Sequence, residues 1–236
     1  MMTVNSLVTV RRLEQFNDMY QIQKKLRLFV LAASIVSCSL AEAEQVTFSE
    51  NWTEQAFSLF SSNKFGLNAD TLDISSEGTV SILWKRVPPL MWEANQANWD
   101  WAVEASVPPT DLTLKGGDDR NLSIYFVFLP QEYLPKSKGK LTDLLNNENV
   151  RVLMYVWGGD HDLGEVMPSP YLEEVGKSII LQRAGIGRAS EQVNLANDFN
   201  RSFGNKPEKL VGIAISADSD DTRSTIISSI SNLHVY

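Results

Sequence analysis

Apolar and polar residues alternate with a period of two through the middle of the chain. In residues 98–107, Trp99 and Trp101 fall on one face of an extended chain and the acidic side chains fall on the other. This alternation predicts a strand with one buried face. Residues 121–129 and 150–158 are apolar at nearly every position, which predicts central strands that are covered on both faces.

Further short segments combine apolar and β-branched residues with flanking turn signals. We predict a strand in each of them, at residues 71–76, 78–86, 177–183, 208–216 and 229–236. The pair Glu77-Gly78 separates the first two of these segments and predicts a hairpin-like turn between them.

Helical spacing of apolar residues occurs in two places. Residues 49–60 follow a capping-box pattern that begins at Thr47, and this predicts an amphipathic helix that packs on a sheet. Residues 190–203 predict a second helix, with Ser190 as its N-cap and Gly204 as its C-terminal stop.

Short strands at regular spacing, with few helices between them, favour an antiparallel arrangement over a parallel α/β sheet. The sequence therefore predicts a mainly β fold: an antiparallel β-sandwich, jelly-roll-like, with one or two flanking helices. No linker composition or internal repeat divides residues 44–236, so we expect this part of the chain to be a single domain.

The N-terminal region has the layout of a secretory signal peptide. A basic cluster at Lys24, Lys25 and Arg27 precedes an apolar run over residues 28–36, and small residues follow. The run is too short to cross a bilayer, so we do not expect an integral membrane protein. Because the basic cluster lies well inside the chain, we expect Met19 to be the true initiator and residues 1–18 to be an upstream extension.

Two processing routes fit this region. Cleavage after Ala41-Glu42-Ala43, or after Ser39-Leu40-Ala41, would release a soluble periplasmic or secreted protein, and this is the route we favour. Alternatively, residues 35–38 resemble a bacterial lipobox that would anchor the protein through a lipid on Cys38. Cys38 is the single cysteine, so the folded part has no thiol for a disulfide, a thiolate metal site or a nucleophile.

The chain is acidic, with a formal net charge of −8. An acidic surface repels phosphate groups, so nucleic acid and anionic membranes are unfavourable partners.

Two groups of acidic residues flank predicted strands: Asp111, Asp118 and Asp119 before residues 121–129, and Asp218, Asp220 and Asp221 after residues 208–216. If these strand ends meet, Asp118, Asp119, Asp218 and Asp220 could bind calcium through carboxylate oxygens. Aspartate next to glycine is also the usual composition of turns, and turn formation is the favoured interpretation.

Aromatic residues are dense in the same strands, and a flat aromatic face can stack on a sugar ring. We predict a ligand-binding site in which Trp99, Trp101, Tyr155 and Trp157 stack on the ligand and Lys115, Asp118 and Asp119 supply polar contacts. Burial in the core is the alternative for the tryptophans. A glycosidase would need a pair of opposed carboxylates, for which Glu93, Glu104, Asp118 and Asp119 are candidates.

Several segments together resemble the domain-of-unknown-function 3047 family of exported bacterial proteins. The similarity runs from about Val46 to Tyr236 and rests on Trp99-x-Trp101, Asp111, Lys115-Gly116-Gly117-Asp118-Asp119, Tyr155-x-Trp157-Gly158, Asp198-Phe199, Phe203-Gly204 and Asp218-x-Asp220-Asp221-Thr222. The resemblance implies a β-sandwich or jelly-roll module, of a kind that in some cases binds carbohydrate, and it implies no established activity.

From these observations we predict an exported envelope protein that binds a ligand without catalysis, with a carbohydrate or glycan as the expected ligand and calcium as a possible structural ion. A carbohydrate-active hydrolase of the same fold and a structural envelope protein without a small ligand are the alternatives.

Overall fold

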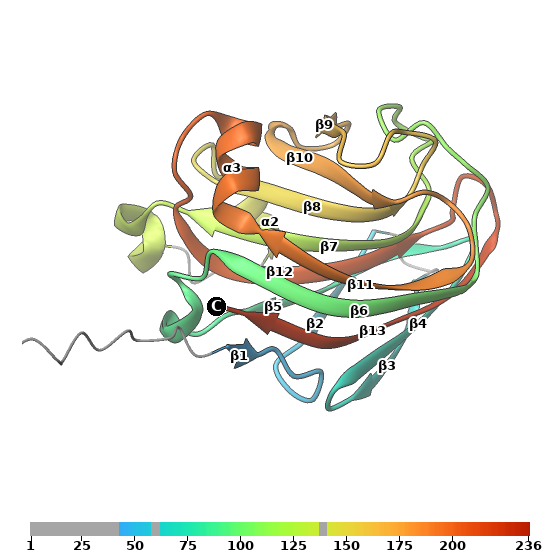
Figure 1. Ribbon diagram of the computed structural model, residues 1–236, viewed down its shortest axis with the longest axis horizontal. Coiled ribbons are helices and arrows are strands. Elements are labelled where there is room, and N and C mark those ends of the chain that lie inside the picture. The colour runs from blue at the N-terminus through green and yellow to red at the C-terminus, as the bar shows by residue number, and fades with distance from the viewer. Residues whose placement is uncertain (1–42, 58–61, 137–140) are drawn as a thin grey trace, which may run out of the picture. The chain divides into compact units, whose positions relative to one another are not determined.

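Two sheets packed face to face contain most of the residues that the computed structural model describes, which are 43–57, 62–136 and 141–236. Figure 1 shows them as two layers. The predicted antiparallel β-sandwich is therefore confirmed. The predictions for the signal peptide, Met19 and Cys38 lie outside the described residues.

The first sheet has six strands in the order β11-β6-β13-β4-β3, and β1 also pairs with β13. All of its pairs are antiparallel. Its strands are β1 (Glu44–Gln45), β3 (Lys64–Asn68), β4 (Thr71–Glu77), β6 (Gln96–Ala105), β11 (Gly187–Asn194) and β13 (Thr225–Val235).

The second sheet has seven strands in the order β2-β5-β12-β7-β8-β10-β9. Its pairs are antiparallel except for the parallel pair of β8 and β10. Its strands are β2 (Thr53–Ala56), β5 (Val80–Arg86), β7 (Arg120–Leu129), β8 (Arg151–Gly158), β9 (Val166–Ser169), β10 (Glu173–Gln182) and β12 (Lys209–Asp218).

The seven-stranded sheet is buried on both faces. Along β7, Ile124 and Phe126 point into the core between the sheets, whereas Tyr125 and Val127 belong to a second apolar cluster on the outer face. This explains why the sequences of β7 and β8 are apolar at consecutive positions rather than at alternate ones. The residues in the middle of this sheet are therefore almost fully buried, and burial of their apolar surface stabilises the fold.

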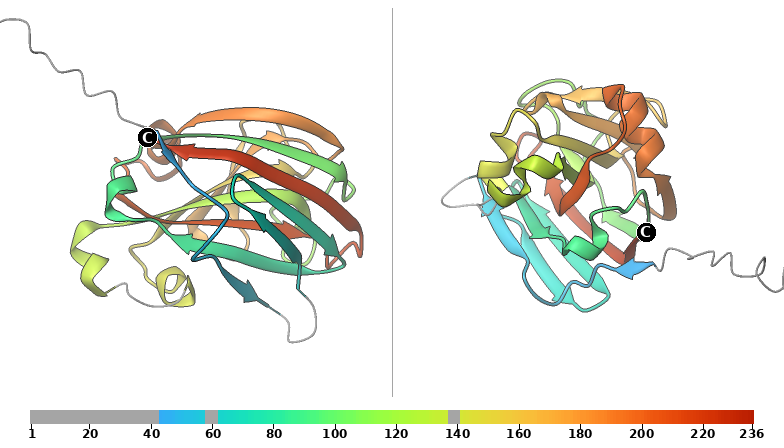
Figure 2. Two further views of the ribbon diagram at one scale, coloured as in Figure 1. Left: turned by 90° about the horizontal axis from the view of Figure 1, so that it is seen from below. Right: turned by 90° about the vertical axis from the view of Figure 1, so that its left-hand side faces the viewer.

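Short helices cover parts of the sandwich. They are η1 (Pro89–Met91), η2 (Gln131–Lys136), α2 (Leu141–Leu145) and α3 (Leu195–Phe203). Leu141 and Leu144 of α2 join the outer apolar cluster, and Figure 2 shows this helix on the side of the seven-stranded sheet that faces away from the six-stranded one. Phe199 of α3 packs edge-on against Phe128 in the core, with ring centroids 5.1 Å apart.

The helix predicted at residues 49–60 is wrong over its described part. The chain bends at residues 48–51 and then forms the edge strand β2, which pairs with β5. Phe48 is fully buried, and Trp52 stacks on it and donates a hydrogen bond to the carbonyl of Thr47. Phe48 is thus packed in the core at a bend of the chain, which the helical spacing of apolar residues does not indicate. Residues 58–60 of the predicted helix lie outside the described part of the chain.

The hairpin predicted at Glu77-Gly78 is also wrong, although both strands exist. β4 pairs with β3 and β13 in one sheet, while β5 pairs with β2 and β12 in the other. The turn therefore carries the chain from one layer to the other. Ser219 fixes it, since its hydroxyl accepts hydrogen bonds from the amides of Gly78 and Thr79.

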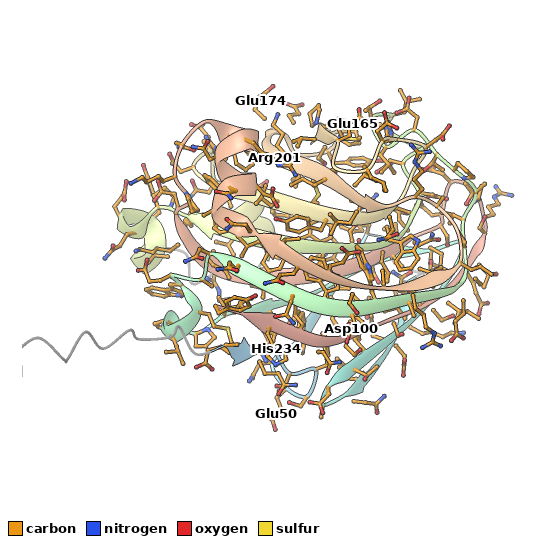
Figure 3. All side chains as sticks on the ribbon, viewed as in Figure 1. Glu50, Asp100, Glu165, Glu174, Arg201 and His234 are labelled. Atoms are coloured by element: carbon orange, nitrogen blue, oxygen red, sulfur yellow. The ribbon has the colours of Figure 1, made fainter. Side chains whose placement is uncertain are left out.

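The second predicted helix is confirmed only from Leu195 onward. Ser190 lies in β11, where its hydroxyl donates to Asp100 on the neighbouring strand β6 (Figure 3). Asn194 is the N-cap instead, and its side chain accepts from the amide of Asn197 at 2.8 Å. Gly204 ends the helix as predicted, with a left-handed φ of 77°.

Among the described residues, no helix is both long enough and apolar enough to span a membrane.

The close approach of β7 and β8 gives a first prediction. Gly158 lies opposite Arg120, and a Cβ on Gly158 would lie 2.7 Å from the Cβ and 3.0 Å from the Cα of Arg120. We expect Gly158→Ala to lower the free energy of unfolding by about 1–3 kcal/mol, because the added methyl must displace backbone. Urea denaturation measures this.

Gly117→Ala is the matched control, because the nearest atom to its added Cβ is 3.8 Å away. Equal denaturation midpoints for the two variants would contradict the prediction.

Candidate functional site

The four predicted stacking residues are core residues. Trp99, Trp101, Tyr155 and Trp157 have exposed fractions of 1%, 2%, 0% and 4%. Their rings pack against one another between the sheets, with centroid separations of 5.4 Å for Trp99–Trp101 and 5.5 Å for Trp101–Trp157. The expectation of a sugar-stacking platform is therefore corrected, because alternation directs these side chains inward from β6 and β8.

The two aspartate-bearing strand ends do meet. Asp119, which is fully buried, accepts hydrogen bonds from the amide and hydroxyl of Thr222 at 2.7 and 2.5 Å and from the amide of Asp221 at 3.3 Å. The segment before β7 is thus joined to the turn after β12. Asp119 acts here as a turn-stabilising residue, in agreement with the favoured interpretation of its sequence.

Asp111 and Lys115 lie further out. Asp111 accepts from the amide and hydroxyl of Thr113, and these local bonds lower the pKa of its carboxyl group. The ammonium of Lys115 lies 5.7 Å from the centre of the Tyr171 ring. The amide of Gly116 also donates to the Tyr171 hydroxyl at 3.3 Å. Lys115 therefore lies against the ring of Tyr171, and Tyr171 lines the same pocket as Asp118.

Arg120 is the residue around which the site is organised. It is the first residue of β7, and its Nη1 donates to a carboxylate oxygen of Asp118 at 2.9 Å and of Asp218 at 3.2 Å. Its Nη2 donates to the hydroxyl of Tyr125, which in turn bonds the hydroxyl of Ser216. Sequence reasoning missed Arg120, although it directly follows the two aspartates and is the nearest cation to them along the chain.

A pocket of about 350 Å³ lies beside this network, on the outer face of the seven-stranded sheet. Its walls are mostly aliphatic, and they include Val80, Ile82, Val127, Met154 and Ala214. At its polar end lie Arg120, Tyr125 and three carboxylates, those of Asp118, Asp218 and Asp220. A concave apolar site with a few convergent polar groups is the usual form of a small-molecule site.

Asp218 is the most perturbed carboxyl group in the pocket. Burial raises the pKa of Asp218 to about 8, against the opposing charge of Arg120, and the nearby carboxylates of Asp220 and Asp119 add to the rise. Carboxyl groups with strongly shifted pKa values are concentrated at functional sites, because burial and neighbouring charges there adjust the pKa to the chemistry or the binding that the site performs.

The four residues predicted to hold calcium divide into two groups. Asp118 and Asp218 form ion pairs with Arg120. Asp119 and Asp220, together with Asp221, bring one carboxylate oxygen each within 4.8 Å of the others. The oxygens of Asp119 already accept from Thr222 and Asp221. Calcium binding stays a prediction.

Comparison with known proteins places the sequence in one family. The family model described as "Protein of unknown function (DUF3047)" matches residues 44–234. No curated protein matches the sequence.

Among solved structures, the chain is similar to the family 11 xylanase from Neocallimastix patriciarum, with 11% identity over 83% of this chain and 99% of that one and a TM-score of 0.39. It is also similar to the xyloglucanase domain of NopAA, a type three effector from Sinorhizobium fredii solved with cellobiose. That match has 9% identity over 81% and 97% of the two chains and a TM-score of 0.41. Likenesses at this level carry no information about ligand or chemistry.

The raised pKa of Asp218 predicts a pH-dependent effect on stability. An aspartate has a pKa of about 3.9 in the unfolded chain, so between about pH 4 and pH 8 the folded state binds the proton more tightly, and stability falls as pH rises. Asp218→Asn mimics the protonated form and removes this slope. We expect the melting temperature of the variant, relative to wild type, to rise from about pH 5 to about pH 9.

Asp162→Asn serves as the control, because Asp162 forms an exposed ion pair with Arg183. A difference between Asp218→Asn and wild type that stays constant with pH would contradict the assignment of the raised pKa to Asp218.

Proposed function

The chain belongs to the DUF3047 family of proteins of unknown function, and we propose that it is a non-catalytic ligand-binding protein whose site is the pocket on the outer face of the seven-stranded sheet. The observation that carries the proposal is the pocket itself, in which aliphatic walls close on one compact network of charged groups. A pocket of this volume accommodates a small organic molecule.

The pocket walls favour a ligand with an aliphatic body over a sugar. Sugars are bound by aromatic faces and by donors and acceptors spread along the site. Here the hydroxyl of Tyr125 accepts a hydrogen bond from Arg120 and bonds the hydroxyl of Ser216. The other aromatic residues of the lining, Phe57 and Tyr171, are largely exposed to solvent, and the tryptophans of β6 and β8 lie in the core on the opposite face of the sheet. The carbohydrate ligand expected from the sequence stays a prediction without its stacking residues.

The hydrolase alternative has one supporting feature, which is the pair of Asp118 and Asp218 at the pocket end. Carboxyl groups held in different protonation states can act as acid and base. Against this, one oxygen of each group accepts a hydrogen bond from the same nitrogen of Arg120, at 2.9 and 3.2 Å. Both groups are thus fixed by a cation instead of being opposed across a groove, and we favour binding.

Export remains part of the proposal and rests on the sequence of residues 24–43. A pocket that binds an aliphatic compound would then act in the periplasm or outside the cell.

The neutral fluorescent probe N-phenyl-1-naphthylamine tests the pocket. Ala214 lies on the pocket floor in β12, and Ala214→Phe would fill the cavity with a large ring. We expect probe affinity to fall by tenfold or more, by about 1.4 kcal/mol, while the melting temperature is kept, because the ring occupies empty volume.

Ala214→Ser is the control at the same position, since it adds little volume and keeps the pocket open. Absence of probe binding to the wild-type protein, or equal binding to Ala214→Phe, would contradict the proposed site.

The leader is tested separately by expressing the full chain in a bacterial host and sequencing the N-terminus of the exported product. We expect the mature protein to begin at Glu44, because Ala41-Glu42-Ala43 has small residues at both cleavage-site positions. A lipid-modified N-terminus at Cys38, or a product retained uncleaved in the cytoplasm, would contradict the favoured route.

A further inference from the structure

One oxygen of Asp218 has no hydrogen-bond donor. Asp218 is 7% exposed. Its Oδ2 accepts from Arg120, whereas its Oδ1 is buried and has no partner among the described residues. A buried carboxylate oxygen without a donor is unfavourable, and such groups are rare in folded proteins. Because Asp218 lines the pocket, a bound molecule is positioned to supply the missing donor.

The charges at this end of the pocket do not balance. Three carboxylates line it, those of Asp118, Asp218 and Asp220, and one guanidinium faces them. Arg120 forms ion pairs with Asp118 and Asp218. Among the described residues, no Lys, Arg or His nitrogen lies within 4.0 Å of Asp220. The raised pKa of Asp218 favours its protonated form at neutral pH, but Asp118 and Asp220 still outnumber the single guanidinium, so the pocket end carries an excess of negative charge.

We propose that the pocket takes an aliphatic primary amine, with its alkyl body against the aliphatic walls and its ammonium bound between Asp218 and Asp220. This inference rests on the proposed function and names the chemical class of the ligand. An ammonium group offers three donors, enough to satisfy Oδ1 of Asp218 and to bond Asp220. It also adds the positive charge that the network lacks.

Other ligand classes fit this end less well. A carboxylate would be repelled by the three aspartates, and a neutral alcohol would leave the charge excess in place. Calcium requires six to eight oxygen ligands, and the positive charge of Arg120, bonded directly to Asp118 and Asp218, opposes the binding of a divalent cation there.

Binding of the amine is coupled to the proton on Asp218. The groups that face Asp218 are Arg120 and Tyr125 from β7, Asp118 and Asp119 before that strand, and Asp220 after β12. Ammonium and proton occupy the same place between Asp218 and Asp220, so binding of the amine displaces the proton. Since burial raises the pKa of Asp218 to about 8, affinity rises with pH up to about pH 8, then stays level, and falls when the amine itself loses its charge near pH 10.

The experiment compares three ligands with the same chain length, octylamine, octanol and octanoate, in competition with N-phenyl-1-naphthylamine on the whole protein. We expect octylamine to displace the probe at a concentration about tenfold or more below that of octanol, because a hydrogen bond to a charged group adds affinity. Octanoate should be the weakest. Between about pH 6 and pH 8 the affinity for octylamine should increase by up to about tenfold per pH unit, while that for octanol stays constant.

Asp220→Asn tests the contact directly, because Asp220 is exposed at the pocket end and its removal spares the ion pairs of Arg120. We expect the ratio of octylamine to octanol affinity to fall to about one at neutral pH. Asp162→Asn makes the same change in net charge at an ion pair that does not line the pocket, and it should keep the wild-type ratio.

The outcomes separate the two proposals. If the neutral probe does not bind, the proposed function itself is wrong. If the probe binds and octylamine is no better than octanol, or if Asp162→Asn and Asp220→Asn reduce the ratio equally, the amine assignment is overturned and the pocket remains. Displacement of octylamine by calcium at millimolar concentration in wild type but not in Asp221→Asn would assign the charge excess to a metal instead.

Discussion

The ion-pair network of Arg120 is the constraint on which the outer face of the molecule depends. The guanidinium of Arg120, at the start of β7, bonds the carboxylate of Asp118 just before that strand and the carboxylate of Asp218 at the end of β12. Arg120 and Asp218 are 98 positions apart in sequence. Removal of Arg120 would leave the buried carboxyl groups of Asp118 and Asp218 without their cation, and an unpaired buried charge lowers the free energy of unfolding. The network therefore fixes where β7 begins relative to β12 and, with it, the polar end of the pocket.

Double burial of the seven-stranded sheet explains why a pocket exists there at all. The core face of this sheet is filled by the aromatic residues of β7 and β8 and by the facing sheet. The outer face is covered by short elements, which include η2, α2 and the turn at Leu172 after β9. Short elements cannot fill the whole surface of a wide sheet, and a cavity with aliphatic walls remains beside Arg120.

The sandwich can be predicted from the sequence because the periodicity of apolar residues predicts most of its central strands. The strands at β6, β7, β8, β12 and β13 follow from alternation and from doubly apolar runs. The errors at two places involve contacts that are distant in sequence: residues 53–56 pair with β5 after the buried Phe48, and Ser219 holds Gly78 in a turn between the layers. For the site, the sequence places two groups of aspartates at strand ends and leaves open whether they meet; the contacts of Asp119 with Asp221 and Thr222 come from the structure, as does the role of Arg120. The dense aromatic residues of β6 and β8 form the core and not a sugar-stacking surface. Alternation with a period of two shows that they share one face of a strand, but it does not show whether that face is buried or exposed to solvent.

The place of β13 in the six-stranded sheet governs the order in which the molecule can be assembled. This strand lies between β6 and β4 and is hydrogen-bonded to both, yet it comes last along the described chain. Until Thr225–Val235 has emerged from the ribosome, the sheet consists of two unconnected parts, β11 with β6 and β3 with β4. The six-stranded sheet therefore cannot be completed before β13 has been synthesised, and strand pairings between segments this far apart in sequence form slowly.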